Sequence, residues 1–514
     1  MILTTAEESR KLDRAAMEEY GLPEAVLMEN AGASLVRLLE GKISWEGRDT
    51  VILCGTGNNG GDGFVAARYA AMEGADVTVL LMGNAAHMGE SSRMYRKAAE
   101  KMGIPVVEIS RAAEALPFVS SADILIDALI GTGLSSAVSG EKAALISMVN
   151  DAAAFVISAD VPSGMVSDTG FAEGAVVEAD VTVALGSRKR GHVLYPGSLY
   201  CGEVLDAPIG IPESAGEAFP VRLMELGDVR RRIPLRRRTA HKGNNGFVGI
   251  FAGSAGMAGA GLLAAQGALY GGAGKTALYS VNDIAWELAG KVPEVMVHGL
   301  ADGACFTEDM VSLAAKAAEA FDVIAMGCGF GRREETLHFT ESLLFQEKIP
   351  VVLDADALFA VAELHIPIEE AEAPLVLTPH VGEFARLTGL SPKEIEERRI
   401  DAAREYAEAH RVVLVLKGAP TVTALPDGRA WVNPTGNPGM ASGGMGDTLT
   451  GVIAALLGQG LSAEDAAACG VYLHGLAGDI LAETVPVGYT ASELARAVPA
   501  ARRRVMDGSS WKQA

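Results

Sequence analysis

Residues 443–447 (GGMGD) combine the residue types that phosphate binding and acid–base chemistry require. An amphipathic helical pattern follows directly, with apolar residues between Leu449 and Leu457 on one face. Glycines let backbone N–H groups approach an anion, and a helix N-terminus adds partial positive charge. A carboxylate in such a cradle can take a proton from a hydroxyl that attacks a phosphoryl group. We therefore predict that Asp447 is a catalytic base, against the simpler alternative that it only caps the helix.

Other loops in the second half of the chain also follow predicted strands. Residues 417–421 (KGAPT) come after an apolar run and offer backbone and side-chain donors suited to a nucleotide. His380 and Glu383 follow another strand, where they can meet a ligand or a metal. The glycine-rich segments 253–260 and 327–331 complete a set of five loops at strand ends. Because ligands of open α/β sheets bind beyond the carboxyl ends of the strands, we expect these loops to share one site.

A strand followed by glycines and a helix also occurs in the first half. Residues 50–54 predict a strand, and Gly55, Gly57 and Gly60 satisfy a GxGxxG pattern before a helix expected to begin near Phe64. The second predicted strand carries no carboxylate at its end, where one would bind the ribose of a dinucleotide. We therefore expect this loop to bind phosphate or sugar through backbone N–H groups, in a different arrangement from a standard dinucleotide site.

Two more predicted strand ends in the first half carry polar side chains. Asp127 opens the segment 127–133 (DALIGTG), and Asp160 with Ser163 lies in the segment 160–164 (DVPSG). Any one of these aspartates alone would be read as a cap or turn residue. Their shared position at strand ends instead favours a crevice that they line together with the first glycine-rich loop.

The elements that must position these groups are short β-branched runs alternating with alanine-rich helical stretches. In the first half the predicted strands are 50–54, 77–81, 124–126, 155–159 and 181–184. In the second half they are 247–251, 276–280, 323–326, 351–353, 375–378 and 412–416. This alternation predicts parallel, doubly wound sheets in both halves. The rhythm breaks between residues 208 and 238, so we predict two α/β domains, 1–220 and 221–514.

Composition restricts the partners of the protein. A formal net charge of -22 over 514 residues repels nucleic acid and anionic lipid, so we expect neither as a partner. The arginines within 230–238 are interpreted as a linker or the edge of a pocket. Five widely separated cysteines form no metal-binding or disulfide pattern. An acidic N-terminus and the absence of a long apolar run predict a cytoplasmic protein.

The loops of the first half resemble the epimerase domain of the NAD(P)H-hydrate repair family. The resemblance rests on residues 58–63, 127–133 and 160–164, and it implies a Rossmann-like doubly wound domain. It implies contacts with the hydrated dinucleotide by Asn58, Asn59, Gly60, Gly61, Asp62, Gly131, Thr132, Gly133, Leu134, Ser135, Ser136, Ala137 and Asp160. It also implies that Asn59, Asp127 and Ser163 hold K⁺, for which oxygen ligands are suited. Asp160 is our candidate acid/base for inverting the hydroxylated carbon; a structural role beside K⁺ is the alternative.

The second half, from about residue 242 to 502, is similar to the ribokinase-like dehydratase domain of the same family. Its most specific motif is 437–447. The resemblance implies that ADP is held by Lys417, Gly418, Ala419, Pro420, Thr421 and Gly446. It implies that the hydrate is held by Ala260, Gly331, His380 and Asp447, with Gly329 fitting as well as Gly331. Mg²⁺ would accompany the nucleotide.

The implied function is repair of hydrated NADH and NADPH. The first domain would interconvert the R and S hydrates, and the second would dehydrate the S form with ADP to give NAD(P)H, AMP and phosphate. We expect a homo-oligomer acting on small molecules. One alternative is a ribokinase-like kinase for a small molecule such as a vitamin precursor, with a non-catalytic ligand-binding first domain. Another is a nucleotide-sensing or scaffold protein.

Overall fold

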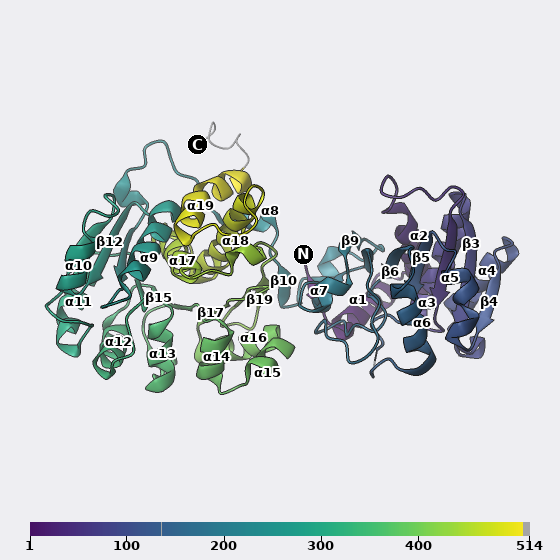
Figure 1. Ribbon diagram of the computed structural model, residues 1–514, viewed down its shortest axis with the longest axis horizontal. Coiled ribbons are helices and arrows are strands. Elements are labelled where there is room, and N and C mark those ends of the chain that lie inside the picture. Colours follow the sequence, from purple (N-terminus) through teal and green to yellow (C-terminus); the bar gives the residue numbers. More distant parts are fainter. Residues whose placement is uncertain (135, 507–514) are drawn as a thin grey trace. The chain divides into compact units, whose positions relative to one another are not determined.

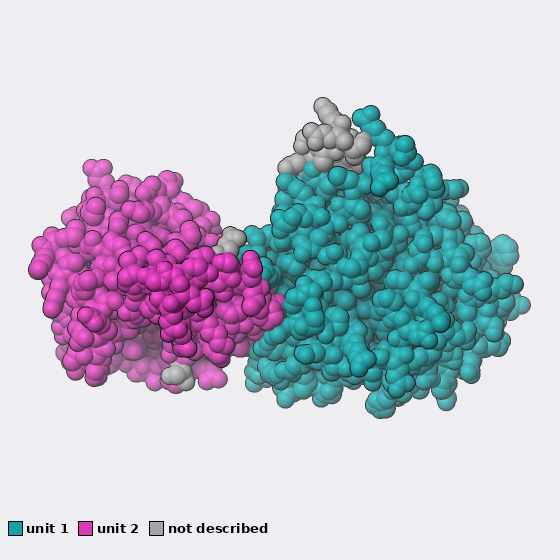
Figure 2. Space-filling view, turned by 180° about the vertical axis from the view of Figure 1, so that it is seen from behind, with its two compact units in different colours: residues 1, 222–514 teal, residues 2–221 magenta. Residues whose placement is uncertain are grey.

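A computed structural model of the protein describes residues 1–134 and 136–506. The chain divides into two compact units, one formed by Ile2–Val221 and the other by Met1 together with the chain from Arg222 onward (Figure 2). Each unit contains a largely parallel β-sheet with helices against it, which confirms the predicted two-domain α/β class. Among the described residues, none of the helices has both the length and the apolar character that a membrane span requires.

The first unit is built on a sheet of seven parallel strands (Figure 1). In sheet order they are β4 (Val106–Ile109), β3 (Asp76–Met82), β2 (Asp49–Cys54), β5 (Ile124–Ala128), β6 (Phe155–Ala159), β7 (Val181–Leu185) and β9 (Glu203–Ala207). The chain runs outward from β2 to β4 and then returns to β5 on the other side of β2. The crevice between the loops after β2 and β5 is therefore the topological switch point, where open α/β sheets bind ligands.

Both faces of this sheet are covered, because alternate residues of the central strands enter two separate apolar layers. Ile52 packs with helices on one face, and Leu53 packs with helices on the other. The helices of the first unit are α1 (Ala6–Glu18), α2 (Glu24–Arg37), α3 (Asn58–Met72), α4 (Glu90–Lys101), α5 (Leu116–Val119), α6 (Gly140–Asn150) and α7 (Gly197–Tyr200). A separate two-stranded parallel pair joins β1 (Leu3–Thr4) to β8 (Arg188–Lys189). Burial on both faces explains why the strands are continuous apolar runs.

The second unit contains a ten-stranded sheet. In sheet order its strands are β10 (Val221–Leu223), β19 (Ala430–Val432), β18 (Val422–Ala424), β17 (Val413–Leu416), β16 (Leu375–Leu377), β15 (Val351–Leu353), β14 (Val323–Met326), β11 (Phe247–Phe251), β12 (Lys275–Ser280) and β13 (Met296–Gly299). The strands from β17 to β13 are parallel, whereas β18 is antiparallel to both β17 and β19. The five loops predicted to share a site follow β11, β14, β16, β17 and β19, and the first four lie at the carboxyl edge of the parallel part.

Helices pack on both faces of this second sheet (Figure 1). They are α8 (Leu226–Arg232), α9 (Ala258–Gly271), α10 (Asn282–Leu288), α11 (Val311–Ala318), α12 (Glu334–Gln346), α13 (Asp356–Glu363), α14 (Val381–Thr388), α15 (Pro392–Glu397), α16 (Arg399–His410), α17 (Met445–Gly458), α18 (Ala463–Ala482) and α19 (Ala491–Met506). Helices α9 and α17 approach so closely that a Cβ added at Gly451 would lie 1.9 Å from the Ala264 carbonyl oxygen. Glycine at this position therefore fixes where α17 lies.

Two predicted boundaries in the first unit are wrong. Helix α3 begins at Asn58 and not near Phe64, so the predicted glycine-rich loop forms the first turns of the helix. Close packing explains why glycine is needed there, since a Cβ at Gly60 would lie 1.9 Å from the Gly55 carbonyl oxygen. The strand predicted over 124–126 extends to Ala128, so Asp127 belongs to β5.

Candidate active sites

A cleft of about 600 Å³ lies at the carboxyl ends of β2, β5 and β6 in the first unit. Of the predicted hydrate-binding residues, those that line it are Asn58, Asn59, Asp62, Gly131, Thr132, Gly133 and Asp160. Gly60 and Gly61 are buried inside α3, and Leu134, Ser136 and Ala137 lie outside the cleft wall. Ser135 is outside the described residues. The structure thus brings three separate loops together at the switch point.

Asp127 is completely buried beneath this cleft. Its carboxylate accepts hydrogen bonds from the Ser163 hydroxyl at 2.5 Å, the Ser163 amide at 2.8 Å, the Ser158 hydroxyl at 3.0 Å and the Leu129 amide at 3.3 Å. Burial nevertheless raises the pKa of Asp127. The Ser163 oxygen also accepts a hydrogen bond from the Ile130 amide at 2.8 Å, so one cluster ties together the loops after β5 and β6.

The side chain of Asn59 is buried beside these loops. A Cβ added at Gly131 would lie 3.3 Å from the Asn59 side chain, which places Asn59 directly against the loop after β5. The Nδ2 atom of Asn59 has no hydrogen-bond partner among the described residues. Nδ2 is a donor and cannot bind a cation, but the amide oxygen of Asn59, the Asp127 carboxylate and the Ser163 hydroxyl are oxygen ligands of the kind that a hard cation takes. The residues predicted to hold K⁺ therefore suit such an ion chemically.

Asp160 is held in an unusual backbone conformation. Its φ is 64°, in the left-handed region that non-glycine residues rarely adopt. Its carboxylate accepts hydrogen bonds from the Leu185 amide at 3.0 Å and from the Lys189 ammonium. Strained residues of this kind persist only where the surroundings fix them. Asp160 is therefore rigidly aimed into the cleft that it lines.

Lys189 and His192 hold Asp160 in this conformation. The Lys189 side chain is only 1% exposed, and its ammonium also donates to the carbonyl oxygens of Leu185 and Ser187 at 2.9 and 3.0 Å. His192 accepts the Lys189 amide at Nδ1, so Nε2 carries the proton and donates to the Asp160 carbonyl oxygen at 2.8 Å. Burial lowers the pKa of His192 to about 3, which keeps the ring neutral. We did not predict either residue, because only the tertiary fold brings them to Asp160.

The cleft concentrates carboxyl groups. Asp62 and Asp13 both line it with Asp160. Burial, followed by the charges of Asp160 and Asp13, raises the pKa of Asp62 well above its ordinary value. Burial also raises the pKa of Asp13, against the charge of Lys189. The cleft therefore contains carboxyl groups in different environments, as acid–base chemistry requires.

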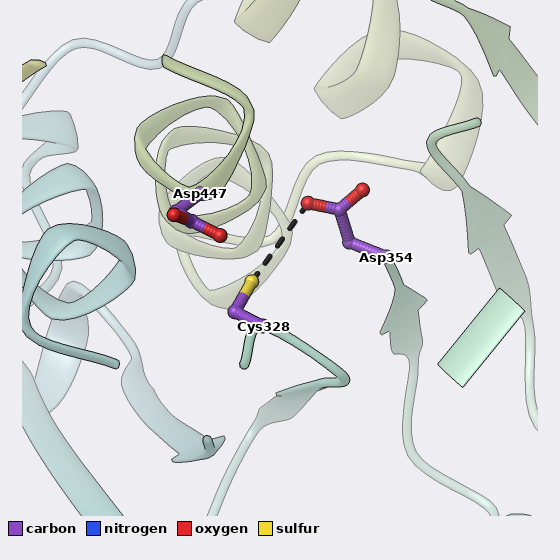
Figure 3. A group of neighbouring side chains, drawn as sticks. All are labelled: Cys328, Asp354 and Asp447. Carbon is purple, nitrogen blue, oxygen red and sulfur yellow. Dashed lines mark hydrogen bonds between the residues drawn. The ribbon is translucent and has the colours of Figure 1, made fainter. Parts of the chain in front are cut away.

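In the second unit, Asp447 lies in the first turn of α17. Gly444 caps this helix with a φ of 89°, and both Gly446 and Asp447 are half-buried. Burial, followed by the negative charge of Asp354, raises the pKa of Asp447 to about 6. Figure 3 shows Asp447 facing Cys328 and Asp354. A carboxyl group with this pKa is ionised at neutral pH yet basic enough to accept a proton.

Lys417 lies directly beneath the same turn. A Cβ added at Gly446 would lie 3.2 Å from the Lys417 Nζ atom. That ammonium donates to Asp354 at 2.8 Å and lies 3.9 Å from Glu383. The predicted nucleotide residues Lys417 and Gly446 are therefore brought together at the N-terminus of α17.

The backbone of 417–421 is held from below by a buried arginine. Arg399 is 2% exposed and donates to the carbonyl oxygens of Pro420 at 2.9 Å and Lys417 at 2.7 Å. The Thr421 hydroxyl donates to the Gly418 carbonyl oxygen at 3.0 Å. Gly418 and Ala419 are exposed, so this loop presents its backbone to solvent at the carboxyl edge. Arg399 was not predicted, because its position 18 residues before Lys417 carries no local signal.

His380 and Gly331 are fixed by neighbouring carboxylates. His380 caps α14, with Nδ1 accepting from the Gly382 amide at 2.9 Å, and its amide donates to Glu383 at 2.8 Å. Its ring is exposed, with Nε2 3.4 Å from Glu383. The Gly331 amide donates to Asp356 at 2.9 Å. These contacts give both residues defined positions at the same sheet edge as Asp447.

Ala260 lies near the alternative loop residue, Gly329. A Cβ at Gly329 would lie 3.0 Å from the Ala260 Cβ, whereas one at Gly331 would lie 3.4 Å from the Ser254 hydroxyl. Both glycines have positive φ, 64° and 82°. The geometry leaves either glycine available as a ligand contact.

Comparisons with known proteins match both halves of the chain. A family described as YjeF-related protein N-terminus matches residues 24–191, and one described as NAD(P)H-hydrate dehydratase matches residues 248–500. Similar relatives, each called bifunctional NAD(P)H-hydrate repair enzyme Nnr, occur in Thermofilum pendens (41% identical, covering 94% of this chain and 92% of the relative) and Escherichia coli (34%, covering 93% and 89%).

Solved structures resemble part of this chain. A ribokinase-like superfamily protein from Enterococcus faecalis is 27% identical with a TM-score of 0.50, covering 55% of this chain and 96% of that protein. An ADP/ATP-dependent NAD(P)H-hydrate dehydratase from Bacillus subtilis, crystallised with ATP and Mg²⁺, is 34% identical with a TM-score of 0.49, covering 56% and 100%. Because the repair-enzyme relatives match along nearly the whole chain, this chain belongs to the family of bifunctional NAD(P)H-hydrate repair enzymes.

Proposed function

We propose that this protein repairs hydrated NADH and NADPH in two steps. The first unit interconverts the R and S hydrates, and the second dehydrates the S hydrate with ADP, giving NAD(P)H, AMP and phosphate. The observation that carries the proposal is Asp447, a half-buried carboxyl group in the first turn of a glycine-capped helix with a pKa of about 6. Family membership supports the substrate.

In the dehydratase site, Asp447 takes the proton of the hydroxyl on the hydrated ring as that oxygen attacks the terminal phosphorus of ADP. The bond from this phosphorus to the bridging oxygen breaks and AMP leaves. The phosphorylated oxygen then departs as phosphate, and loss of a ring proton restores the double bond. Gly446 and 417–421 bind the nucleotide, while Ala260, Gly331 and His380 orient the hydrate. Backbone N–H groups at the start of α17 offset the phosphate charge.

Mg²⁺ would enter the site bound to the phosphates of the nucleotide and would neutralise part of their charge. The cluster of Cys328, Asp354 and Asp447 does not suit a resident Mg²⁺. The oxygens of Asp354 already accept hydrogen bonds from Lys417 and Thr450, and a thiol is a poor ligand for a hard cation. No protein ligand is therefore assigned to Mg²⁺.

In the epimerase site, Asp160 gives a proton to the hydroxyl as the bond from that oxygen to the ring carbon breaks, the ring nitrogen stabilises the resulting cation, and Asp160 takes a proton from water as the water adds to the opposite face. The predicted contacts that line the cleft bind the hydrate: Asn58, Asn59, Asp62, Gly131, Thr132, Gly133 and Asp160. Asn59, Asp127 and Ser163 would hold K⁺, whose charge would offset the carboxylates and the substrate phosphates. The side-chain oxygens that these three residues offer support this assignment.

The protein acts on small molecules in the cytoplasm as a homo-oligomer, without nucleic-acid or membrane partners. Its net charge of -22 supports the exclusion of anionic polymers and surfaces. Joining the two activities in one chain has a physical rationale. Only one epimer fits the dehydratase site, so its supply must be renewed from the other.

A product assay separates repair from small-molecule phosphorylation, the other reaction that a glycine-rich loop and an aspartate can perform. Purified protein is incubated with the S hydrate, ADP and Mg²⁺, and AMP, free phosphate and near-ultraviolet absorbance of reduced nicotinamide are followed. Repair predicts that all three rise together in equal amounts. A stable phosphorylated hydrate without free phosphate would establish a kinase instead.

A further inference from the structure

We propose that Asp354 is a positioning residue of the dehydratase site, which anchors the Lys417 ammonium beneath the glycine-rich turn and keeps a fixed negative charge beside Asp447. The inference rests on the proposed function of this site. Asp354 follows β15, and neither the sequence motifs nor the assigned ligand contacts include it.

The hydrogen-bond partners of Asp354 keep its carboxyl group ionised. It is 1% exposed, and its two carboxylate oxygens accept hydrogen bonds from Lys417 at 2.8 Å and from the Thr450 hydroxyl at 2.8 Å. The Cys328 thiol donates to it at 3.8 Å. Burial acts to raise the pKa of Asp354, but the ammonium and the hydrogen bonds outweigh it and lower the pKa. Asp354 is therefore a buried, permanently ionised carboxylate.

Lys417 is the cation that this carboxylate holds. Burial acts to lower the pKa of Lys417, but Asp354 and Glu383 outweigh it and raise the pKa. The ammonium lies against Gly446 of α17, so the ion pair fixes the end of β17 to the start of α17. Thr450, one turn further along α17, bonds the same carboxylate. Asp354 thus links the predicted nucleotide loop to the helix that carries Asp447.

The chain conformation at Asp354 points to a functional demand. Ala355 has a φ of 49°, in the left-handed region, although alanine has no preference for it. This turn directs Asp354 towards Lys417 and Thr450, and Asp356 towards the amide of Gly331. Strain at a single alanine between two carboxylates that hold site residues is the pattern expected where a site requires both.

The charge of Asp354 acts on Asp447. Other charged or titratable groups face this region: Cys328 after β14, Asp356 after β15, Lys417 after β17, Glu383 on α14 through Lys417, and His474 on α18 through the Met445 carbonyl. Among the charges, Asp354 raises the pKa of Asp447 more than Lys417 lowers it. A like charge makes a carboxylate a stronger base, so Asp354 maintains the basicity that proton removal needs.

The test is the pH dependence of kcat for ADP-dependent dehydration of the S hydrate by the full-length Asp354→Asn variant. The wild-type rate should fall as the pH falls through about 6. We call this fall on the acid side of the pH profile the acid limb. In Asp354→Asn the acid limb should lie at a pH lower by about one unit or more, because the charge that repels the ionised Asp447 is gone. We also expect the plateau kcat to fall by about tenfold, because Lys417 loses its anchor.

A matched control is Asp322→Asn, which makes the same isosteric change at the opposite, amino end of the sheet. Asp322 accepts a hydrogen bond from the Phe247 amide at 2.8 Å and touches no site residue. Its acid limb should stay at the wild-type pH. A lower kcat in Asp354→Asn with an unshifted acid limb would overturn the inference. Loss of a purely structural residue changes the amount of active enzyme and not the pKa of its catalytic base.

A double variant, Asp354→Asn with Lys417→Met, covers the case in which the single variant does not fold. It removes both members of the Asp354–Lys417 ion pair, and the fall in its rate on the acid side should still lie at a lower pH than in the wild type. Failure of the inference is distinguishable from failure of the proposed function. Without wild-type AMP production the function itself is refuted, whereas an active wild type and an unmoved limb in both variants refute only the role of Asp354.

Discussion

Replacing Gly451 with alanine should damage the second unit selectively. Its Cβ would lie 1.9 Å from the Ala264 carbonyl oxygen and 2.6 Å from the Ala268 amide nitrogen, both backbone atoms of α9. Ordinary contacts need at least about 3 Å, so α17 and α9 must separate by about 1 Å. Overpacking of this kind costs about 1–3 kcal/mol, and the better helix propensity of alanine returns at most about 1 kcal/mol.

The net expectation for Gly451→Ala is a loss of about 1–2 kcal/mol of unfolding free energy, or about 2–8 °C in the Tm of this unit. Asp447 lies one turn earlier on the same helix, and a shift of about 1 Å at a catalytic group can cost about 100-fold in rate. Differential scanning calorimetry and ADP-dependent dehydration of the S hydrate measure the two effects. Epimerisation by the first unit should be unchanged.

Gly458→Ala is the matched control on the same helix. Its added methyl group would meet nothing closer than 3.4 Å, an ordinary contact distance. We expect wild-type stability and activity from it. If Gly451→Ala were equally stable and active, the close approach of α9 and α17 would not position Asp447, and the geometric argument for this site would fail.

Four other outcomes are expected. Dehydration should slow below pH 6 and reach about a tenth of its plateau rate near pH 5, because Asp447 must be ionised to accept a proton. A rate that does not change with pH would exclude Asp447 as the base. Asp447→Asn should lower kcat by about 100- to 10,000-fold without loss of folding, as judged by circular dichroism. Lys189→Met should slow epimerisation by about tenfold or more, since it releases the strained Asp160, whereas Lys42→Met, which removes an exposed ion pair with Glu203, should not. Replacing K⁺ with a bulky organic cation should slow epimerisation in the wild type but not in Asp127→Asn, and equal sensitivity would place K⁺ elsewhere.

Periodicity and loop chemistry were enough to predict the strands that carry both sites. The predicted strand 247–251 coincides with β11, and the loops expected at the carboxyl edges lie there. The start of α3 was predicted six residues too late, because glycines that serve close packing look like a loop in sequence. Local signals therefore located the strand-end loops but not the boundary of this helix.

The supporting residues could not be predicted, for a different reason. Lys189 reaches Asp160 across 29 positions of the chain, and Lys417 reaches Asp354 across 63. Both ion pairs depend on which strand ends become neighbours in the sheet. A sequence pattern shows the residue types at each loop but not their pairing, so residues that act through another side chain appear only in the folded structure.

The central claim, that two sites in one chain repair both hydrates, is tested most directly by one measurement. Near-ultraviolet absorbance is followed while an R/S mixture of the hydrate is treated with ADP, Mg²⁺ and K⁺ by wild type, Asp447→Ala and Asp160→Ala. We predict full restoration by wild type, none by Asp447→Ala, and rapid use of the S fraction with slow use of R by Asp160→Ala. Equal residual rates in all three proteins would contradict the assignment of both sites.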